Sequence, residues 1–591
     1  MSKEKSVVLL ALIVLAAYAA EPNPPLWPDS VKIIDPANPS AGQAAVNAVY
    51  AENGGHVPDD HGQWSESRYA LFFKPGSHAV DVNVGYYTSV YGLGKHPSDT
   101  ILRSLICENG SYNPNNGALS NFWRSAENFE TTSTKTWNNH VTTLWAVSQA
   151  APLRRAIING NLDLYQYNQG TYAGYASGGY MADVKVSGGV YWGSQQQFIA
   201  RNSEFGSSHN GVWNMVFVGC RGAPGSHCSN SGGTPVTNVA SSPLIAEKPF
   251  ITTDGSKYYL QVPRLEANKE GATPNYDNAN EVDFSQVYVA TASDSAATIN
   301  SKLAEGLHLV LTPGNYNLDD SIKINNANTV VLGLGMATLI SATGKPVIQV
   351  GDVDGVRIAG LLLQAGPSKT EALLLWGSGY AGSQSNPGVV SDVFGRVGGT
   401  NNPNDQQMTV DVMVKINNGN IIYDNSWFWR ADHGVSGLVY NSMNPVQTGI
   451  QVNGDNVIAY GLASEHTLGN LVEWNGNNGH VYFYQSEYPY DVTQENYANE
   501  GYVSYKVADS VTSHYGFGIG VYSYFRDHAV DVKAGIEAPT RDSVTFVNSL
   551  TVFLNGNGQI DHVIDNTGNP VHSGAQLAYV CQYDAASVVV E

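Results

Sequence analysis

Short apolar runs separated by Asn, Asp and Gly recur through the second half of the chain. The runs at 355–361, 419–423, 455–460 and 479–484 each predict one β-strand, and no long helical pattern lies between them. Asn and Gly supply the tight corners that such strands require. This alternation predicts the coils of a parallel β-solenoid, in which each coil buries its apolar side chains against the next.

The spacing of the runs favours a solenoid over a β-sandwich. Val331 and Val356 lie 25 residues apart, and Val457 and Val481 lie 24 residues apart. The 36-residue step from Ile421 to Val457 fits a coil in which one turn is longer. The antiparallel strands of a sandwich, which is the alternative, would recur at closer intervals.

The opening of this pattern occurs twice. Residues 71–78 combine an apolar strand with a Pro-Gly turn, and alternating apolar positions lead to a strand that ends in Gly-Leu-Gly at 92–94. Residues 309–316 and 331–335 repeat the same order. The repeat predicts an all-β fold of two tandem parallel β-helices packed side by side. A long cleft between their flanks would suit an extended polymer.

The repeat also sets the expected domain boundaries. A first β-helix domain would span 21–245 and a linker 246–290. The second β-helix domain, with additional C-terminal strands, would span 291–591. Residues 296–304 have helical composition, so we expect a short helix that caps the second solenoid.

Residues 1–20 have the pattern of a secretory signal peptide. Lys3 and Lys5 precede an apolar core at 7–17, and small residues at 17–19 offer a cleavage point. A membrane anchor is the alternative, but a span needs about 20 apolar residues. We therefore expect a secreted, extracellular protein without membrane attachment after signal removal. The sequon at 109–111 would make it a glycoprotein in a host that glycosylates its exports.

Composition narrows the picture by exclusion. Charged residues make up only 14% of the chain, which argues against a disordered acidic chain and a coiled coil. The net charge is −21 and no basic run occurs, so nucleic acid is not an expected partner. The acidic balance also disfavours a polyanionic polymer. The 61 Gly and 34 Tyr residues suit a turn-rich protein that faces a neutral polar ligand such as a glycan.

The four cysteines do not form a metal-binding pattern. Cys107, Cys220, Cys228 and Cys581 lack Cys-x-x-Cys spacing, so neither a zinc site nor another metal or cofactor is expected. Cys220 and Cys228 could close a short disulfide in an exported protein, but the sequence leaves the pairing open.

Three patches of the second half combine acidic with aromatic residues, at 427–434, 464–466 and 485–490. Glu465 lies eight residues after Val457, as Trp429 lies eight after Ile421, so stacking of coils would bring these positions to one face. Aromatic rings stack on sugar faces, and a partly desolvated carboxyl keeps its proton long enough to act as a general acid. The aligned patches therefore indicate glycoside hydrolysis.

Each patch also has a purely structural explanation. Asp432 or Glu465 could cap a corner or pair with Arg430, and Trp427 and Trp429 could be ordinary packing residues. Arg430 beside Asp432 also keeps a calcium-dependent lyase as a weak alternative. The sequence contains neither a Gly-x-Ser-x-Gly elbow nor a phosphate-binding Gly-rich loop, so an ordinary esterase and a nucleotide enzyme are unsupported.

The order of these motifs resembles glycoside hydrolase family 55. The similar stretches are 427–433, 465–466 and 485–490, together with 193–198 and the Arg-Asn pair at 201–202 in the first half. The resemblance covers about residues 70–530. It implies a monomeric exo-acting β-1,3-glucanase with a polysaccharide substrate, built from two right-handed, pectate-lyase-like β-helices. Thr467 and Gln195 depart from the family pattern, which makes the exact substrate less secure than the fold.

The resemblance also implies roles for individual residues. Glu487 would be the general acid of an inverting reaction, in which water attacks from the opposite face of the sugar. Candidates for holding that water are Gln196, Gln197 and Ser203, and the conceivable base-side acids are Glu465 and Glu204. The candidate substrate contacts are Trp192, Glu204, Trp429, Asp432, His433, His466, Trp474 and Tyr488.

Two other functions fit the same scaffold. One is depolymerisation of another extracellular polymer, either a different glycan or a polyester. The other is a non-catalytic carbohydrate-binding or wall protein, although a pure binder needs aromatic rings more than a desolvated acid.

Overall fold

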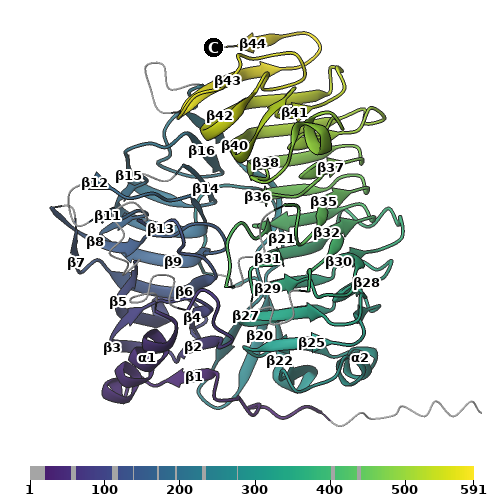
Figure 1. The fold of residues 1–591 in the computed structure, drawn as a ribbon. Coiled ribbons are helices and arrows are strands. Elements are labelled where there is room, and N and C mark those ends of the chain that lie inside the picture. Colours follow the sequence, from purple (N-terminus) through teal and green to yellow (C-terminus); the bar gives the residue numbers. More distant parts are fainter. Residues whose placement is uncertain are drawn as a thin grey trace, which may run out of the picture.

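The computed structural model describes residues 20–54, 62–108, 117–137, 139–168, 172–193, 196–228, 235–275, 277–400, 406–435 and 441–590. Nearly all of the expected signal peptide and the whole sequon at 109–111 lie outside these residues. The chain forms two right-handed parallel β-helices that stand side by side, as the repeat predicted (Figure 1). In the described part of the chain, no helix combines the length and apolar character that a membrane span requires.

The first β-helix is built on one large, mainly parallel sheet. In spatial order its strands are β1 (Val31–Ile34), β2 (Tyr69–Phe73), β4 (Thr88–Gly92), β6 (Arg124–Thr132), β5 (Thr100–Cys107), β8 (His140–Trp145), β10 (Asn161–Asp163), β13 (Gly179–Tyr191), β14 (Gln197–Arg201), β16 (Asn214–Val218) and β17 (Val236–Val239). Four further strands join it at the side: β3 (Gly76–Asn83), β7 (Lys135–Trp137), β9 (Leu153–Asn159) and β15 (Glu204–His209). A separate short pair is formed by β11 (Tyr167–Asn168) and β12 (Tyr172–Ala173).

The second β-helix has two sheets that face each other across its core. The larger runs through β23 (Val287–Ala290), β24 (His308–Leu311), β27 (Val330–Ser341), β29 (Arg357–Gln364), β31 (Gly388–Val397), β33 (Ile421–Asp424), β36 (Ile458–Glu465), β38 (Gly479–Glu487), β40 (His514–Val532), β42 (Val544–Ile560), β43 (Gln576–Tyr583) and β44 (Val588–Val590), with β25 (Asn315–Leu318) and β34 (Phe428–Arg430) at its side. The smaller consists of β26 (Ile322–Ile324), β28 (Ile348–Val350), β30 (Thr370–Trp376), β32 (Val410–Ile416), β35 (Val446–Val452), β37 (Val472–Trp474), β39 (Tyr505–Val507) and β41 (Ile536–Glu537). The last strands of the larger sheet, β42 to β44, pair antiparallel.

Both helices begin in the same way. The first begins with the strand β1, the helix α1 (Pro39–Asn53) and the strand β2, and the second with β23, α2 (Ala296–Ala304) and β24. In the main sheet β2 then pairs with β4, and β24 pairs with β27. Leu71 pairs with Val90 in the first copy and Leu309 with Val331 in the second. The predicted cap helix is therefore present as α2, and the sequence pattern did not reveal its counterpart α1.

Apolar side chains and corner asparagines hold the coils together. Val, Leu and Ile from successive strands form one buried cluster inside each helix. At one corner, Asn453 donates to Asn417 at 2.8 Å, and Asn475 donates to Asn453 at 2.8 Å. Such a ladder satisfies polar groups at the bend of each coil, which explains the Asn-rich punctuation of the sequence.

The segment expected to be a linker, 246–290, contains strands of its own. β18 (Ser242–Ala246) pairs antiparallel with β21 (Leu265–Lys269). β19 (Phe250–Thr253), β20 (Tyr258–Val262) and β22 (Asn280–Asp283) form a small antiparallel sheet near the lower end of the molecule (Figure 1).

The flanks of the two β-helices pack tightly, and the expected long cleft is therefore wrong. Three buried clusters combine residues of both helices. In one, Trp123 of the first helix stacks on Trp427 of the second, with ring centroids 4.8 Å apart. In another, Tyr180 and Ile199 pack with Tyr460. Large aromatic rings fill the space between the two β-helices, and what remains of that space is divided into local pockets.

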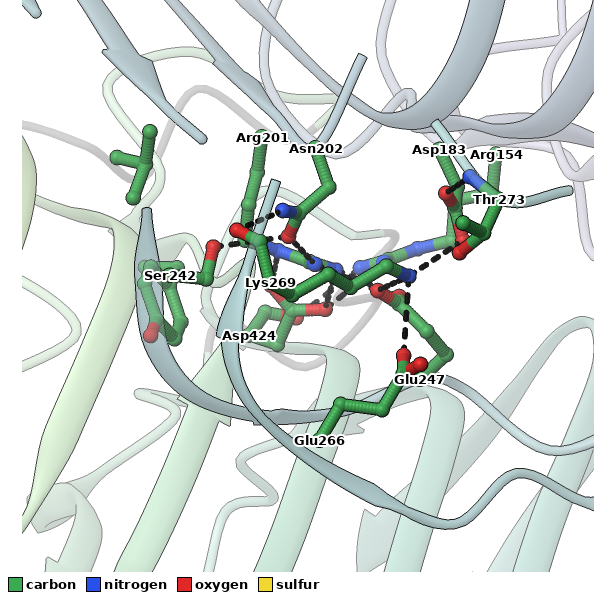
Figure 2. Close-up of polar contacts among 12 residues, drawn as sticks. Arg154, Asp183, Arg201, Asn202, Ser242, Glu247, Glu266, Lys269, Thr273 and Asp424 are labelled. Atoms are coloured by element: carbon green, nitrogen blue, oxygen red, sulfur yellow. Dashed lines mark hydrogen bonds and ion pairs between the residues drawn. The ribbon is translucent and has the colours of Figure 1, made fainter. Parts of the chain in front are cut away.

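Buried ion pairs also cross this interface (Figure 2). Arg154 contacts Asp392 at 2.7 Å and Asp424 at 2.8 Å, and all three side chains are at most 2% exposed. Arg201 contacts the same Asp424 at 2.9 Å and Glu247 at 2.6 Å. Each guanidinium thus has a carboxylate partner, which offsets the large cost of removing a charge from water.

The disulfide differs from the suggested short loop. Cys228 bonds to Cys581 across 353 residues, whereas Cys220 is a free thiol whose Sγ lies 3.2 Å from the Ala200 carbonyl oxygen. The bridge ties the first helix to β43 at the end of the second. Local spacing could not indicate a partner so distant in the sequence.

Candidate functional site

Glu465 and Glu487 stand on neighbouring coils of the second helix, each as the last residue of its strand. Parallel pairing of β36 with β38 sets Glu465 directly beside Glu487, and pairing of β34 with β36 sets Trp429 beside Glu465. Adjacent strands are about 4.8 Å apart, so the two carboxyl groups are neighbours. The prediction that these positions share one face is confirmed. His466 follows with a φ of 65°, which turns the chain away immediately after the carboxylate.

Three N–H donors surround the Glu465 carboxylate. Gln149 donates to Oε1 at 2.9 Å, Gln485 donates to the same oxygen, and the Trp427 indole donates to Oε2 at 2.8 Å. Gln149 lies between β8 and β9 of the first helix, so this donor crosses the interface. Glu465 is 4% exposed, and donors to a buried carboxylate favour its ionised form.

Glu487 has different surroundings. Its side chain is 16% exposed, and its Oε2 lies 3.8 Å from Nε2 of His466. The described residues give it no comparable set of N–H donors, and its hydrogen-bond partner is the Tyr490 hydroxyl. Burial, together with the negative charges of Glu465 and Asp432, raises the pKa of Glu487 well above its usual range. These surroundings favour the protonated form of the carboxyl.

The contrast between the two acids is typical of a general acid and its ionised counterpart. Burial raises the pKa of Glu465 to about 7, although its hydrogen bonds from Gln485, Trp427 and Gln149 act in the opposite direction. Because the two groups interact, the charged state of one favours the protonated state of the other. Glu465 has the donors that stabilise a charge, so of the two groups Glu487 is the one whose protonated form is favoured.

Asp432 and His433 form the outer rim of the site. His433 Nδ1 lies 3.0 Å from Asp432 Oδ1, and its Nε2 lies 2.6 Å from the Gln63 amide nitrogen of the first helix. Burial opposes ionisation of Asp432, but the charge and hydrogen bond of His433, together with the charge of His466, hold the pKa of Asp432 low. Among the described residues, no group of His, Cys, Asp and Glu has an arrangement that could hold a metal ion.

Arg430 is committed elsewhere. It forms two hydrogen bonds to Asp491, at 2.9 and 2.7 Å, and donates to the Met443 carbonyl. Asp432 therefore does not pair with Arg430, and the guanidinium is not available as the base of a lyase.

Comparison with known proteins agrees with this geometry. Residues 287–487 match the LAM55 pectate lyase-like domain, and residues 59–221 match the pectate lyase-like domain of rhamnogalacturonase A and epimerases. The chain is 40% identical over 554 residues to an exo-beta-1,3-glucanase of Streptomyces sp. (strain SirexAA-E / ActE), which covers 92% of this chain and 87% of that protein. The chain belongs to glycoside hydrolase family 55.

Solved structures support the same assignment for this family 55 hydrolase. SacteLam55A from Streptomyces sp. SirexAA-E has a TM-score of 0.87 at 39% identity, covering 95% of this chain and all of that one. A glutamate-to-alanine variant of sacteLam55A in complex with glucose also has a TM-score of 0.87, at 38% identity, covering 96% of this chain and all of that one.

Three expected sugar platforms of the hydrolase lie inside its cores instead. Trp192 is buried in the first helix and donates to Ser208. Trp474 and Tyr488 are buried in the core of the second helix, where Tyr488 donates to the Ala534 carbonyl at 2.9 Å. Their rings cannot reach substrate. Alternation along the strand sends Tyr488 inward when Glu487 faces outward.

Other expected residues of the first helix also lie away from the carboxylates. Ser203 is fully buried and donates to the Arg201 carbonyl. Glu204 lies on the outer surface, 3.6 Å from Lys185, so it is not the base-side acid. Of the three residues expected to hold the attacking water, only Gln197 lines a narrow cavity whose lining also includes Gln149 and Gln485.

Gln196 and Trp429 take intermediate places. The backbone carbonyl of Gln196 accepts from the Tyr522 hydroxyl, at 3.4 Å, across the helix interface. Trp429 adjoins the site, but Trp64 and Trp427 stack on it with ring centroids 6.1 and 4.9 Å away. It is 1% exposed and supports the site without offering an open face.

Sequence reasoning missed the donors that distinguish the two acids. Gln485 could have been found, since it lies two residues before Glu487 and strand alternation puts both on one face. Trp427 was noticed only as part of a motif. Gln149 and Gln63 carry no sequence signal, because tertiary packing alone brings them from the first helix to the second.

Proposed function

We propose that the chain is an exo-acting, inverting hydrolase of β-1,3-glucan with Glu487 as its general acid. The observation that carries this proposal is the pair of adjacent carboxyl groups in unlike surroundings. Glu465 is held by three N–H donors, whereas Glu487 lies among acidic neighbours that keep it protonated. The name of the 40% identical relative supports the substrate and the exo mode.

In the proposed reaction, Glu487 donates its proton to the departing glycosidic oxygen, and water attacks the anomeric carbon from the opposite face of the sugar. An inverting base lies about 6.5–9.5 Å from the acid to admit that water, whereas Glu465 stands on the next strand, about 4.8 Å away, so Glu465 is not assigned as the base. The charge of Glu465 favours the protonated form of Glu487. The attacking water releases its proton to solvent on the far side of the sugar.

The experiment is digestion of laminarin with product analysis. Glucose as the sole early product supports exo action, and a ladder of oligosaccharides contradicts it. Proton NMR of the first product tests the stereochemistry, because inversion at a β-linkage releases the α-anomer. Retention would require a covalent intermediate and a different role for Glu465.

The alternative polymer substrates are tested by the same enzyme on a panel of neutral glycans and polyesters. Preference for a polymer other than β-1,3-glucan would reassign the substrate while leaving the acid pair in place. The family membership and the retained acid pair speak against the non-catalytic alternative.

We also propose that the protein is exported, on the basis of the N-terminal pattern at 1–20. Expression of the full chain with its native N-terminus should give a product in the medium or periplasm that starts near residue 20. A full-length product in the cytoplasm would contradict export. Sedimentation of the purified product should give the mass of one processed chain, slightly below the 63.3 kDa of the full sequence, if it acts as a monomer.

A further inference from the structure

A second pocket lies in the same row of side chains as the carboxyl pair. Strand pairing links Asn317, Ile340, Gln364 and Arg396 in register, and Arg396 pairs next with Trp429. The row then continues to Glu465 and Glu487. The pocket measures about 270 Å³ and is lined by the first four of these residues. Its opposite wall comes from the first helix.

Arg396 is buried in this wall without a carboxylate. It is 1% exposed. It donates to the Tyr87 hydroxyl at 2.7 Å and to the side-chain amide oxygen Oε1 of Gln364 at 2.5 Å, both of which are neutral acceptors. Its Nε has no acceptor among the described residues. Arg396 lines the pocket and is positively charged, and one of its buried N–H groups therefore has no acceptor among the described residues.

Arg68 adds a second buried cation. It is 4% exposed, donates to Thr338 at 2.8 Å and to the Ser65 carbonyl at 3.0 Å, and lies 4.1 Å from the centroid of the Tyr87 ring. Burial, with a smaller contribution from the charge of Arg396, lowers its pKa to about 10. The acid that lines the pocket, Glu66, is exposed.

Three other buried arginines of this protein have carboxylate partners, whereas Arg124 and Arg357, like Arg396, contact no carboxylate among the described residues. Arg154, Arg201 and Arg430 each contact at least one buried carboxylate within 2.9 Å. Two like charges without such a partner are costly in a buried site, and an anionic ligand would offset that cost. The planar guanidinium is suited to bind an oxyanion through paired N–H groups.

We propose that this pocket binds a small oxyanion-bearing ligand, with a carboxylate or sulfate group held by Arg396 and Arg68. The volume admits a molecule of about one sugar ring, so an acidic monosaccharide and an inorganic oxyanion are the two sources of that group. Neutral sugar rings, which the carboxyl pair is proposed to act on, are not its ligands. The inference concerns binding and holds whether or not the proposed glucanase activity is correct.

The test is isothermal titration calorimetry of the intact protein with glucuronate, sulfate and glucose at one pH and low ionic strength. We expect glucuronate or sulfate to bind at least about tenfold more tightly than glucose. Arg396→Met should weaken the anion about tenfold or more. Asn317→Asp places a carboxylate at the exposed mouth of the pocket and should weaken it several-fold without disturbing the core.

Arg357→Met is the matched control. Arg357 is also buried with an unpartnered nitrogen, but it does not line the pocket, so its loss should leave anion binding unchanged. Circular dichroism checks that each variant folds. If Arg396→Met does not fold, Asn317→Asp alone decides the outcome.

Each result bears on the proposal. Preference for glucuronate over sulfate identifies an acidic sugar as the source, and the reverse identifies an inorganic oxyanion. Absence of anion binding by the unmodified protein overturns the proposal. Binding of glucose as tight as that of the anions also overturns the proposal, because the pocket would then be a neutral sugar subsite. Anion binding that neither Arg396→Met nor Asn317→Asp alters overturns it as well.

Discussion

The two β-helices open with the same strands and helix but contribute different chemistry to the site. The second supplies both carboxyl groups, fixed side by side by the register of β36 and β38. The first supplies the neutral amides Gln149 and Gln63, which reach across the interface to Glu465 and His433. Stacking within one helix thus sets the distance between the acids. Packing against the other helix adds one of the three donors that favour the charged form of Glu465.

The interface between the two helices is closely packed. Stacked indole rings and buried ion pairs fill it. A hydrogen bond to Glu465 that depends on another domain needs such a fixed relative position, since small displacements of a positioned group cost large factors in rate. Four changes would break or sharpen this comparison, in order of decreasing effect.

Replacement of the acid on the second helix should have the largest effect. Glu487→Gln removes the proton donor while keeping the shape, so kcat/KM on laminarin should fall about a thousandfold. The matched variant on the first helix is Glu204→Gln, whose parent residue lies on the outer surface near Lys185. It should retain full activity. Equal losses in the two variants would remove the distinction between the helices.

The next largest effect is on stability. Arg154→Met leaves Asp392 and Asp424 with less compensation in the interface, which should lower the free energy of unfolding by about 3 kcal/mol. The exposed pair of Arg103 and Asp81 gives the control, because Arg103→Met should leave the unfolding midpoint almost unchanged. Urea unfolding followed by tryptophan fluorescence measures both. Similar midpoints for the two variants would contradict a structural role for the interface pairs.

A smaller effect is expected when the donor from the first helix is removed. Gln149→Leu should lower kcat/KM about tenfold to a hundredfold. Loss of an N–H donor disfavours the ionised form of Glu465, so its pKa should rise and the acid limb of the rate profile should move to higher pH. Gln485→Leu, on the second helix, removes a donor to the same oxygen and should act in the same direction. An unmoved acid limb in both variants would mean that Glu465 does not act as the ionised group.

The smallest effect concerns the alkaline limb. Burial and the charge of Glu465 are the larger causes of the raised pKa of Glu487, and the charge of Asp432 adds to them. Asp432→Asn removes that third contribution. The pKa of Glu487 should therefore fall, and the alkaline limb should move to lower pH by less than about one unit. The pH dependence of kcat/KM gives this limb directly. A shift to higher pH would show that Asp432 does not act through its charge on Glu487.

Much of the architecture could be predicted from the sequence, because a β-helix repeats a local pattern. The apolar runs, the Asn corners and the duplicated opening each correspond to strands, ladders or caps that the structure contains. The coil alignment of Trp429 with Glu465 followed from the same repeat. Parallel stacking turns sequence intervals into spatial neighbours, so local spacing was sufficient.

The rest of the site depends on contacts for which sequence spacing gives no measure. Gln149 lies 316 residues before Glu465, and Cys228 lies 353 before Cys581. Aromatic residues were equally ambiguous. Tyr488 and Trp474 alternate into the core, and only the register of the folded coil separates them from residues that face outward.

The most direct test of the central claim compares two substrates of the Glu487→Gln variant. Laminarin needs a proton on its departing sugar oxygen, whereas dinitrophenyl β-glucoside has a leaving group that departs without one. If Glu487 is the general acid, the variant loses about a thousandfold in kcat/KM on laminarin and little on the aryl glucoside. Equal, large losses on both substrates would contradict that role and assign Glu487 to the attack on the sugar.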